Sequence, residues 1–130
     1  MSTIKVDNIR IASESVSRPA TGVAAAWVNF DGTTVTAPND MTGVRDSLNM
    51  TGVVDNGVGD YTANISSNMS DPNYSASFTT GQSTDVSITN RACCVSVMNA
   101  SFVRGSVYTA TGGARIDMSY NGFAIHGDLA

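Results

Sequence analysis

The stretch GDYTANI, residues 59–65, decides the fold class of this chain. Tyr61, Ala63 and Ile65 occupy one phase of a two-residue period, and polar residues occupy the other. Side chains of a strand point alternately to opposite faces, so this pattern predicts a strand with one face against a core. The DNG sequence at 55–57 is typical of turns and predicts a hairpin that leads into the strand.

The same alternation recurs along the chain and predicts an all-β fold. Apolar residues alternate with polar ones over residues 74–79 and 115–120, and Asn-Gly at 121–122 predicts a tight hairpin turn. Ser, Thr and Asn supply 41 of the 130 residues, and these types favour strands and turns over helices. We expect a single antiparallel β-sandwich or barrel-like domain over residues 26–130, with a short turn at 38–45 as the one helical alternative.

Residues 1–25 differ from the rest and are predicted to form an extended N-terminal arm and linker. The arm's apolar residues come in two short strand-like bursts and are Ile4, Val6, Ile9 and Ile11. A polar segment containing Pro and Gly follows, which is typical of a linker. Because so short a segment cannot bury its own isoleucines, we expect the arm to lie against a neighbouring subunit or a larger assembly.

The charge of the chain argues against two classes of partner. Charged residues make up 14% of the sequence, the net charge is −4, and the seven basic residues are scattered. Direct binding of nucleic acid through phosphates needs a basic patch, so it is not expected. No apolar run approaches the ~18 residues of a membrane span, so membrane insertion is not expected either.

No pattern of catalytic residues, metal ligands or cofactor-binding residues stands out, and we expect a protein that is not an enzyme. Most aspartates adjoin Gly, Asn or Pro, where they serve turns, and His126 is the only histidine. Cys93 and Cys94 are neighbours, and a bond between them would be strained on a strand. The oxygens of Asp55, Asn56 and Asp60 offer a Ca²⁺ site as a weaker alternative to a hairpin turn, because the spacing is not that of an EF-hand.

Aromatic residues on the apolar phases of the expected strands define a predicted core. The single tryptophan lies in WVNFDGTTVT, residues 27–36, before an Asp-Gly turn. We expect Trp27 and Phe30 to begin a core strand and to cover the base of the sandwich. The predicted structural core comprises Trp27, Phe30, Tyr61, Tyr74 and Phe78.

A second set of aromatic residues defines a candidate contact surface. Phe102, Arg104 and Tyr108 share one strand phase, opposite Val103 and Val107. Aromatic rings beside a guanidinium are typical both of sugar-binding surfaces and of subunit interfaces. The sequence does not separate these two readings, and we favour the subunit contact.

Four motifs resemble a C-terminal domain of tailed-phage virion proteins of the tail-fibre-like type. They are WVNFDG, RDSLNM, DNGVGDYT and DPNY, and the opening STIKVDNI resembles the short segment that precedes such domains. The resemblance covers residues 1–12 and 26–78, and the DNGVGDYT hairpin is its most specific part. Leu48 stands where the family usually has Phe. Residues 35–40, VTAPND, are an insertion relative to the shorter spacing between the first two motifs in the family.

The resemblance implies a non-enzymatic structural protein of the virion, assembled in the host cytoplasm. One reading is a homotrimeric tail-fibre, tail-tip or host-adsorption component that makes weak multivalent contacts to host surface glycans. The alternative is a capsid decoration (cement) protein or short head fibre, anchored by its N-terminal arm. In either reading the expected partners are further copies of the chain and other virion proteins, either of the tail or the major capsid protein.

Overall fold

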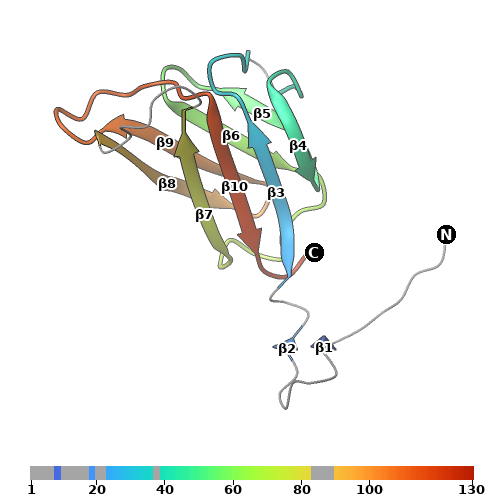
Figure 1. Cartoon of the computed structure of the whole chain (residues 1–130). Coiled ribbons are helices and arrows are strands. Elements are labelled where there is room, and N and C mark those ends of the chain that lie inside the picture. The colour runs from blue at the N-terminus through green and yellow to red at the C-terminus, as the bar shows by residue number, and fades with distance from the viewer. Residues whose placement is uncertain (1–7, 10–17, 20–22, 37–38, 83–89) are drawn as a thin grey trace.

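The computed structural model describes residues 8–9, 18–19, 23–36, 39–82 and 90–130, and its body is a β-sandwich. Figure 1 shows two antiparallel sheets of four strands, packed face to face. The first, which we call the β3 sheet, has the order β4-β3-β10-β7, and the second, the β9 sheet, has the order β5-β6-β9-β8. The strands are β3 (Ala24–Phe30), β4 (Val44–Leu48), β5 (Met50–Asp55), β6 (Asp60–Ile65), β7 (Ser75–Gly81), β8 (Arg91–Asn99), β9 (Phe102–Thr109) and β10 (Tyr120–His126).

The strand over residues 60–65 and its hairpin are confirmed. Along β6, Tyr61, Ala63 and Ile65 are buried while the residues between them are partly exposed. β5 pairs with β6 through a turn in which the Gly57 N–H donates to Asp55 Oδ1 over 2.8 Å. The sequence pattern therefore gives the strand, its inward face and its turn correctly.

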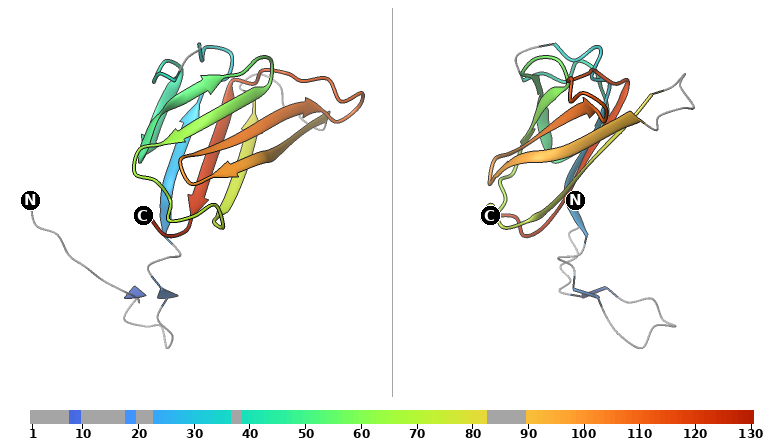
Figure 2. Two further views of the ribbon diagram at one scale, coloured as in Figure 1. Left: turned by 180° about the vertical axis from the view of Figure 1, so that it is seen from behind. Right: turned by 90° about the vertical axis from the view of Figure 1, so that its left-hand side faces the viewer.

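The core lies between the two sheets and is built from their inward phases. Figure 2 views the sandwich from behind and from the side, so that both layers can be followed. Three phenylalanine rings stack in one row: the Phe123 centroid lies 6.2 Å from that of Phe30 and 4.2 Å from that of Phe78, and Tyr61 meets Phe30 edge to face. Gly105 of β9 faces this row, and a Cβ there would lie 2.7 Å from Phe78. The absence of a side chain at this position is what lets the two sheets approach.

Between β4 and β5, a single residue carries the chain from the β3 sheet to the β9 sheet. Asn49 separates β4 from β5 and has a φ of 55°, which bends the chain sharply. Its side chain holds the corner, because Nδ2 donates to the carbonyls of Ala25 and Ser67 over 3.2 Å and 3.1 Å. Asn tolerates this backbone conformation better than most residues, and here its amide also satisfies neighbouring backbone groups.

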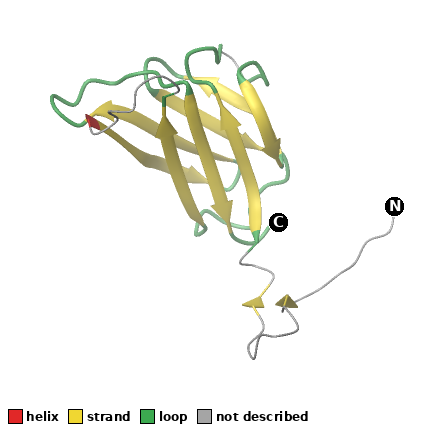
Figure 3. Ribbon diagram, viewed as in Figure 1, coloured by secondary structure: helices red, strands yellow, loops and turns green. Residues whose placement is uncertain are grey.

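Three expectations about local structure are wrong. Residues 116–119 form an irregular segment, not a strand, with one bridge from Arg115 to Tyr108 beside it. Asn121 and Gly122 lie within β10 between two partner strands, so they do not form a hairpin turn. The turn over 39–43 is not helical and leads directly into β4, and Figure 3 colours it as a loop.

Within residues 1–22 of the N-terminal arm, the structure describes four residues. β1 (Asn8–Ile9) and β2 (Arg18–Pro19) pair antiparallel with each other, and Figure 1 draws them apart from the sandwich. Ile4, Val6 and Ile11 lie outside the described residues, and only the backbone of Ile9 is described. The sandwich begins at Ala24, two residues before the predicted boundary.

Among the described residues, no helix is long and apolar enough to cross a membrane.

Candidate contact surfaces

The predicted surface at Phe102, Arg104 and Tyr108 lies on the outer side of the β9 sheet. Val103 and Val107 point into the core and are fully buried, whereas the three predicted residues occupy the opposite phase and are partly exposed. The structure therefore brings them onto one face, as the alternation indicates. The left view of Figure 2 looks onto this sheet.

This face contains a buried carboxylate between two arginines. Asp60 is 1% exposed, and its two oxygens accept from Nε and Nη2 of Arg104 over 2.8 Å and 2.7 Å. Nη1 of Arg115 donates to the second of these oxygens. The hydrogen bond from Arg104 is the main cause that lowers the pKa of Asp60, and the same bond raises the pKa of Arg104. Asp60 therefore stays ionised and holds both guanidinium groups against the sheet.

Strand register explains how these three residues meet. Asp60 lies opposite Ser106 of β9, two residues from Arg104 on the same face of the sheet. Arg115 does not belong to β6, but it pairs with β9 next to the first residue of β6 and lies opposite Tyr108. Asp60 thus has one arginine beside it in each direction along β9. In the sequence, Asp60 ends the segment 55–60 that predicts a hairpin turn, although its phase, shared with Thr62 and Asn64, indicates an outward-facing strand residue.

At the alternative Ca²⁺ site, residues 55–60, carboxylate oxygens that would bind the ion accept hydrogen bonds from the protein instead. Asp60 is occupied by the two arginines, and Asp55 accepts the backbone N–H of Gly57. Across the part of the chain that the structure describes, no three His, Cys, Asp or Glu side chains gather as a metal site. The segment is a hairpin turn whose acidic residues serve the fold.

Tyr61 and Asp117 tie the irregular segment to the end of the sandwich. The Tyr61 hydroxyl donates to Asp117 Oδ1 over 2.6 Å, and the Gly59 N–H donates to the same oxygen over 2.6 Å. Burial, followed by the hydrogen bond to Asp117, raises the pKa of Tyr61 well above its ordinary value. A phenol that stays neutral and hydrogen-bonded in this way serves structure.

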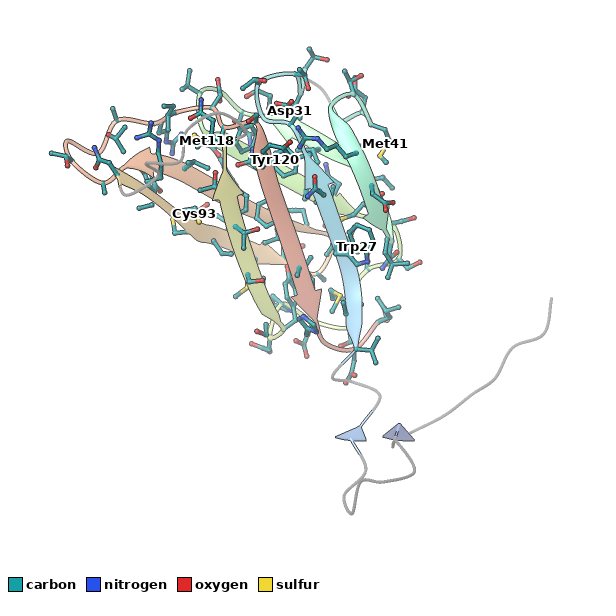
Figure 4. All side chains as sticks on the ribbon, in the orientation of Figure 1. Trp27, Asp31, Met41, Cys93, Met118 and Tyr120 are labelled. Atoms are coloured by element: carbon teal, nitrogen blue, oxygen red, sulfur yellow. The ribbon has the colours of Figure 1, made fainter. Side chains whose placement is uncertain are left out.

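The prediction that Trp27 belongs to the core is wrong. Val28 and Phe30 of β3 are 2% and 0% exposed and point inward, so Trp27 lies on the opposite phase, on the outer face of the β3 sheet. It is half-buried there, between Leu48 of β4 and Ala124 of β10. Figure 4 looks onto this face and labels Trp27. The other four predicted core residues, Phe30, Tyr61, Tyr74 and Phe78, are buried in the core.

A β-bulge places Arg45 on the outer face of the β3 sheet. Asn29 pairs with Asp46 and Phe30 with Val44, so Arg45 is the extra residue between them. Its guanidinium carbon lies 4.3 Å from the centre of the Tyr120 ring, and its Nη2 lies 3.0 Å from Asp31 Oδ2. The arginine thus joins β3, β4 and β10 across the outer surface.

The two adjacent cysteines point to opposite sides of β8, as expected for strand neighbours, and both are free. Cys93 packs toward the core, its thiol donates to the Phe78 carbonyl over 3.2 Å, and burial raises its pKa. Cys94 is exposed on the outer face of the β9 sheet, 3.3 Å from the Tyr108 hydroxyl.

The chain is thus an antiparallel β-sandwich whose two outer faces carry different side chains: Asp60 with its two arginines on the β9 sheet, and Trp27, Arg45 and Tyr120 on the β3 sheet. Comparisons with protein-family models, with curated proteins and with solved structures find no match to this chain.

Proposed function

We propose that this chain is a non-enzymatic structural protein of a tailed-phage virion, acting as a homotrimeric tail-fibre, tail-tip or other host-adsorption component. The observation that carries the proposal is the distribution of side chains on the sandwich. The Asp60 and Asp117 carboxylates and the Tyr61 phenol are engaged in structural contacts, whereas large apolar and aromatic side chains lie on the outer faces of both sheets. Such a surface serves contact and assembly.

Three aspartates and the buried phenol of Tyr61, all groups that an enzyme could use, are committed to the fold. Asp60 is held by two arginines, Asp117 by Tyr61 and the Gly59 backbone, and Asp31 by Arg45. Each of these contacts joins segments that are distant in sequence. Their role is therefore to hold strands and connections in register.

The resemblance of the chain's motifs to tail-fibre-like proteins is what supports a host-adsorption role. A rigid sandwich presents its outer faces and end loops without losing conformational entropy on contact. In a homotrimer three copies of one weak site act together, which raises avidity for repeated surface glycans without any new contact. The exposed ring of Tyr120 and the half-buried ring of Trp27 suit stacking on sugars or on a neighbouring chain.

The alternative is a capsid decoration protein or short head fibre, and the N-terminal arm favours it. β1 and β2 pair with each other and with neither sheet of the sandwich. An arm of this kind can add a strand to an edge of a neighbouring virion protein while the sandwich projects outward. This reading makes the arm the anchor and the sandwich the exposed part.

Immunogold electron microscopy of intact particles separates the two readings. An antibody against the sandwich that labels the tail or its fibres identifies an adsorption component, and screening against host glycans follows. Label over the head identifies a decoration protein. A lack of label on every particle, when the same antibody recognises the purified chain, refutes the proposal that the chain belongs to the virion.

Deletion of residues 1–22 tests the anchoring role of the arm. We expect the shortened chain to keep the thermal midpoint of the full chain, because both four-stranded sheets lie between Ala24 and His126. We also expect it to be missing from purified particles. Incorporation of the shortened chain at the normal copy number would show that the arm is not the anchor.

A further inference from the structure

Two arginines on the outer face of the β9 sheet share one buried carboxylate, so one positive charge is left over. Arg104 and Arg115 donate to the same oxygen of Asp60, which brings their guanidinium groups side by side. The Asp60 side chain is 1% exposed, whereas the arginine side chains are 40% and 47% exposed. Among the outward-facing residues that the structure describes on β5, β6, β8 and β9, no further side chain is charged. An excess positive charge is thus concentrated at one place on a chain whose net charge is −4.

Asp60 holds the arginines in an arrangement that suits a second carboxylate. Arg104 uses Nε and Nη2 on Asp60, and Arg115 uses Nη1. Within the described part of the chain, no hydrogen bond engages Nη1 of Arg104 or Nε and Nη2 of Arg115. These N–H groups are available to an acceptor from outside the chain. Because both guanidinium groups are already fixed, such an acceptor gains charge-assisted hydrogen bonds at little cost in side-chain entropy.

The aromatic ring next to the arginines suits a sugar ring. Tyr108 lies directly opposite Arg115, and its partly exposed side chain belongs to the same face. Ser106, which lies opposite Asp60, is two residues from Tyr108 along β9, so roughly 7 Å separate the two rows. A pyranose ring stacked on Tyr108 would therefore bring a carboxylate on that ring to the guanidinium groups.

Small side chains leave this part of the face open to a ligand. Ser106 and Cys94 continue the row of Asp60 across the sheet, and Ala92 lies beside Tyr108 in the next row. In the described strands, these two rows contain none of the large aliphatic side chains that anchor protein interfaces. The sequence alone favours a subunit contact for this surface, but the shared carboxylate and its excess positive charge favour an acidic sugar.

We propose that Arg104 and Arg115 bind the carboxylate of a uronic acid in an acidic host-surface glycan, with the sugar ring stacked on Tyr108. This inference rests on the host-adsorption role within the proposed function and names the class of glycan. A neutral sugar offers no charge to the arginine pair, so the site discriminates against it. One such site is weak, but uronic acids repeated along a polymer would engage three copies in a homotrimer at once.

Binding of the full chain to immobilised polygalacturonate at pH 7, measured by biolayer interferometry, tests the proposal. Neutral dextran and dextran sulfate of matched charge density are the comparison polymers. The variants are Arg115→Gln, in which Asp60 keeps both bonds from Arg104, and Tyr108→Ala. Arg45→Gln is the matched control, because it removes the same charge from the outer face of the other sheet. Circular dichroism confirms that each variant is folded.

We expect wild type and Arg45→Gln to bind polygalacturonate with equal affinity and not to bind dextran. Arg115→Gln should bind about tenfold more weakly or less, because the site loses both a charged donor and its excess charge. Tyr108→Ala should bind about fivefold more weakly, because the sugar ring loses its stacking partner. Dextran sulfate should bind more weakly than polygalacturonate, since the site is matched to a planar carboxylate.

Other outcomes overturn the inference. Equal weakening in Arg45→Gln and Arg115→Gln would show that the polymer responds only to overall charge, and equal binding of dextran sulfate would show a site for any anion. Full binding by Arg115→Gln would exclude the arginine pair, and full binding by Tyr108→Ala would exclude the stacked sugar. If wild type does not bind, and Arg115→Gln loses the multimer in analytical ultracentrifugation, the pair is a subunit contact.

The failure of this inference and the failure of the proposed function give different results. If wild type ignores polygalacturonate while the antibody labels the tail, the adsorption role stands and only the acidic glycan is wrong. If wild type binds through Arg115 while no particle is labelled, the glycan site stands and the virion role is refuted.

Discussion

Replacement of Asp60 by Asn removes the negative charge beneath Arg104 and Arg115 with almost no change in volume. The side chain is 1% exposed and accepts three charge-assisted hydrogen bonds, two from Arg104 and one from Arg115. In the variant one carboxylate oxygen becomes an amide nitrogen, which donates and therefore opposes the arginine N–H groups. Two positive charges also lose the carboxylate that separates them.

The expected loss of stability is about 2–3 kcal/mol. A hydrogen bond to a charged group contributes ~1.5–3 kcal/mol, so three would give a larger sum. The loss is smaller because both arginines are about half exposed and can be hydrated in the variant. For a domain of this size the thermal midpoint should fall by roughly 6–12 °C.

The pH dependence gives an independent test with a fixed sign. The arginines hold the pKa of Asp60 below its ordinary value of 3.8, so the native state favours the ionised carboxylate. The resulting stability is present above pH 3.8 and is lost as the pH falls through the lowered pKa of the folded state. The difference in unfolding free energy between wild type and Asp60→Asn should therefore be constant from pH 7 to pH 5 and shrink below pH 4.

Urea unfolding followed by circular dichroism, in half-unit steps from pH 7 to pH 3, measures this difference. Asp46→Asn is the matched control, because Asp46 is an exposed aspartate on a strand, and it should change stability by less than about 0.5 kcal/mol. A gap between wild type and Asp60→Asn that is as large at pH 3 as at pH 7 would refute the charge-based reasoning. If Asp60→Asn does not fold, Arg115→Gln provides a milder version with the same pH dependence.

Three further predictions address packing. Phe30→Ala should cost about 3–5 kcal/mol because the ring is fully buried, whereas Trp27→Ala on the outer face should cost less than half of that, as measured by urea unfolding; equal losses would contradict the assignment of Trp27 to the outer face. Gly105→Ala should cost roughly 1–3 kcal/mol, since the new Cβ would press on the Phe78 ring, and an unchanged thermal midpoint would exclude the close approach of the sheets. Tyr61→Phe should cost about 1–3 kcal/mol because Asp117 loses its phenol donor, and a neutral effect in differential scanning calorimetry would deny that tie a structural role.

Local sequence signals were reliable where local and tertiary requirements agree. Alternation along β6 predicted which residues are buried, and alternation along β9 predicted the face shared by Phe102, Arg104 and Tyr108. The turn residues before β6 form the hairpin that their types favour. Strand geometry alone fixes such features, because successive side chains must point to opposite faces.

The same signals failed where a distant segment decided the outcome. Asn121-Gly122 favours a hairpin turn locally, yet pairing with β3 on one side and β7 on the other makes it part of a strand. Trp27 is among the most hydrophobic residues of the chain, yet Phe30, three residues on, occupies the opposite phase of β3 and takes the place in the core. Hydrophobicity indicates which residues prefer burial, but sheet register decides which phase receives it.

The sequence by itself determined an all-β sandwich, its principal inward-facing residues and the face that bears Arg104. Only the tertiary structure decided the order of the strands, the outward position of Trp27 and the burial of Asp60 between two arginines. Asp60 lies 44 residues from Arg104 and 55 residues from Arg115 in the sequence. The three residues meet because β6 pairs with β9 and Arg115 forms a bridge to the same strand. Alternation is a property of neighbouring residues, whereas a charge cluster of this kind depends on which strands become neighbours.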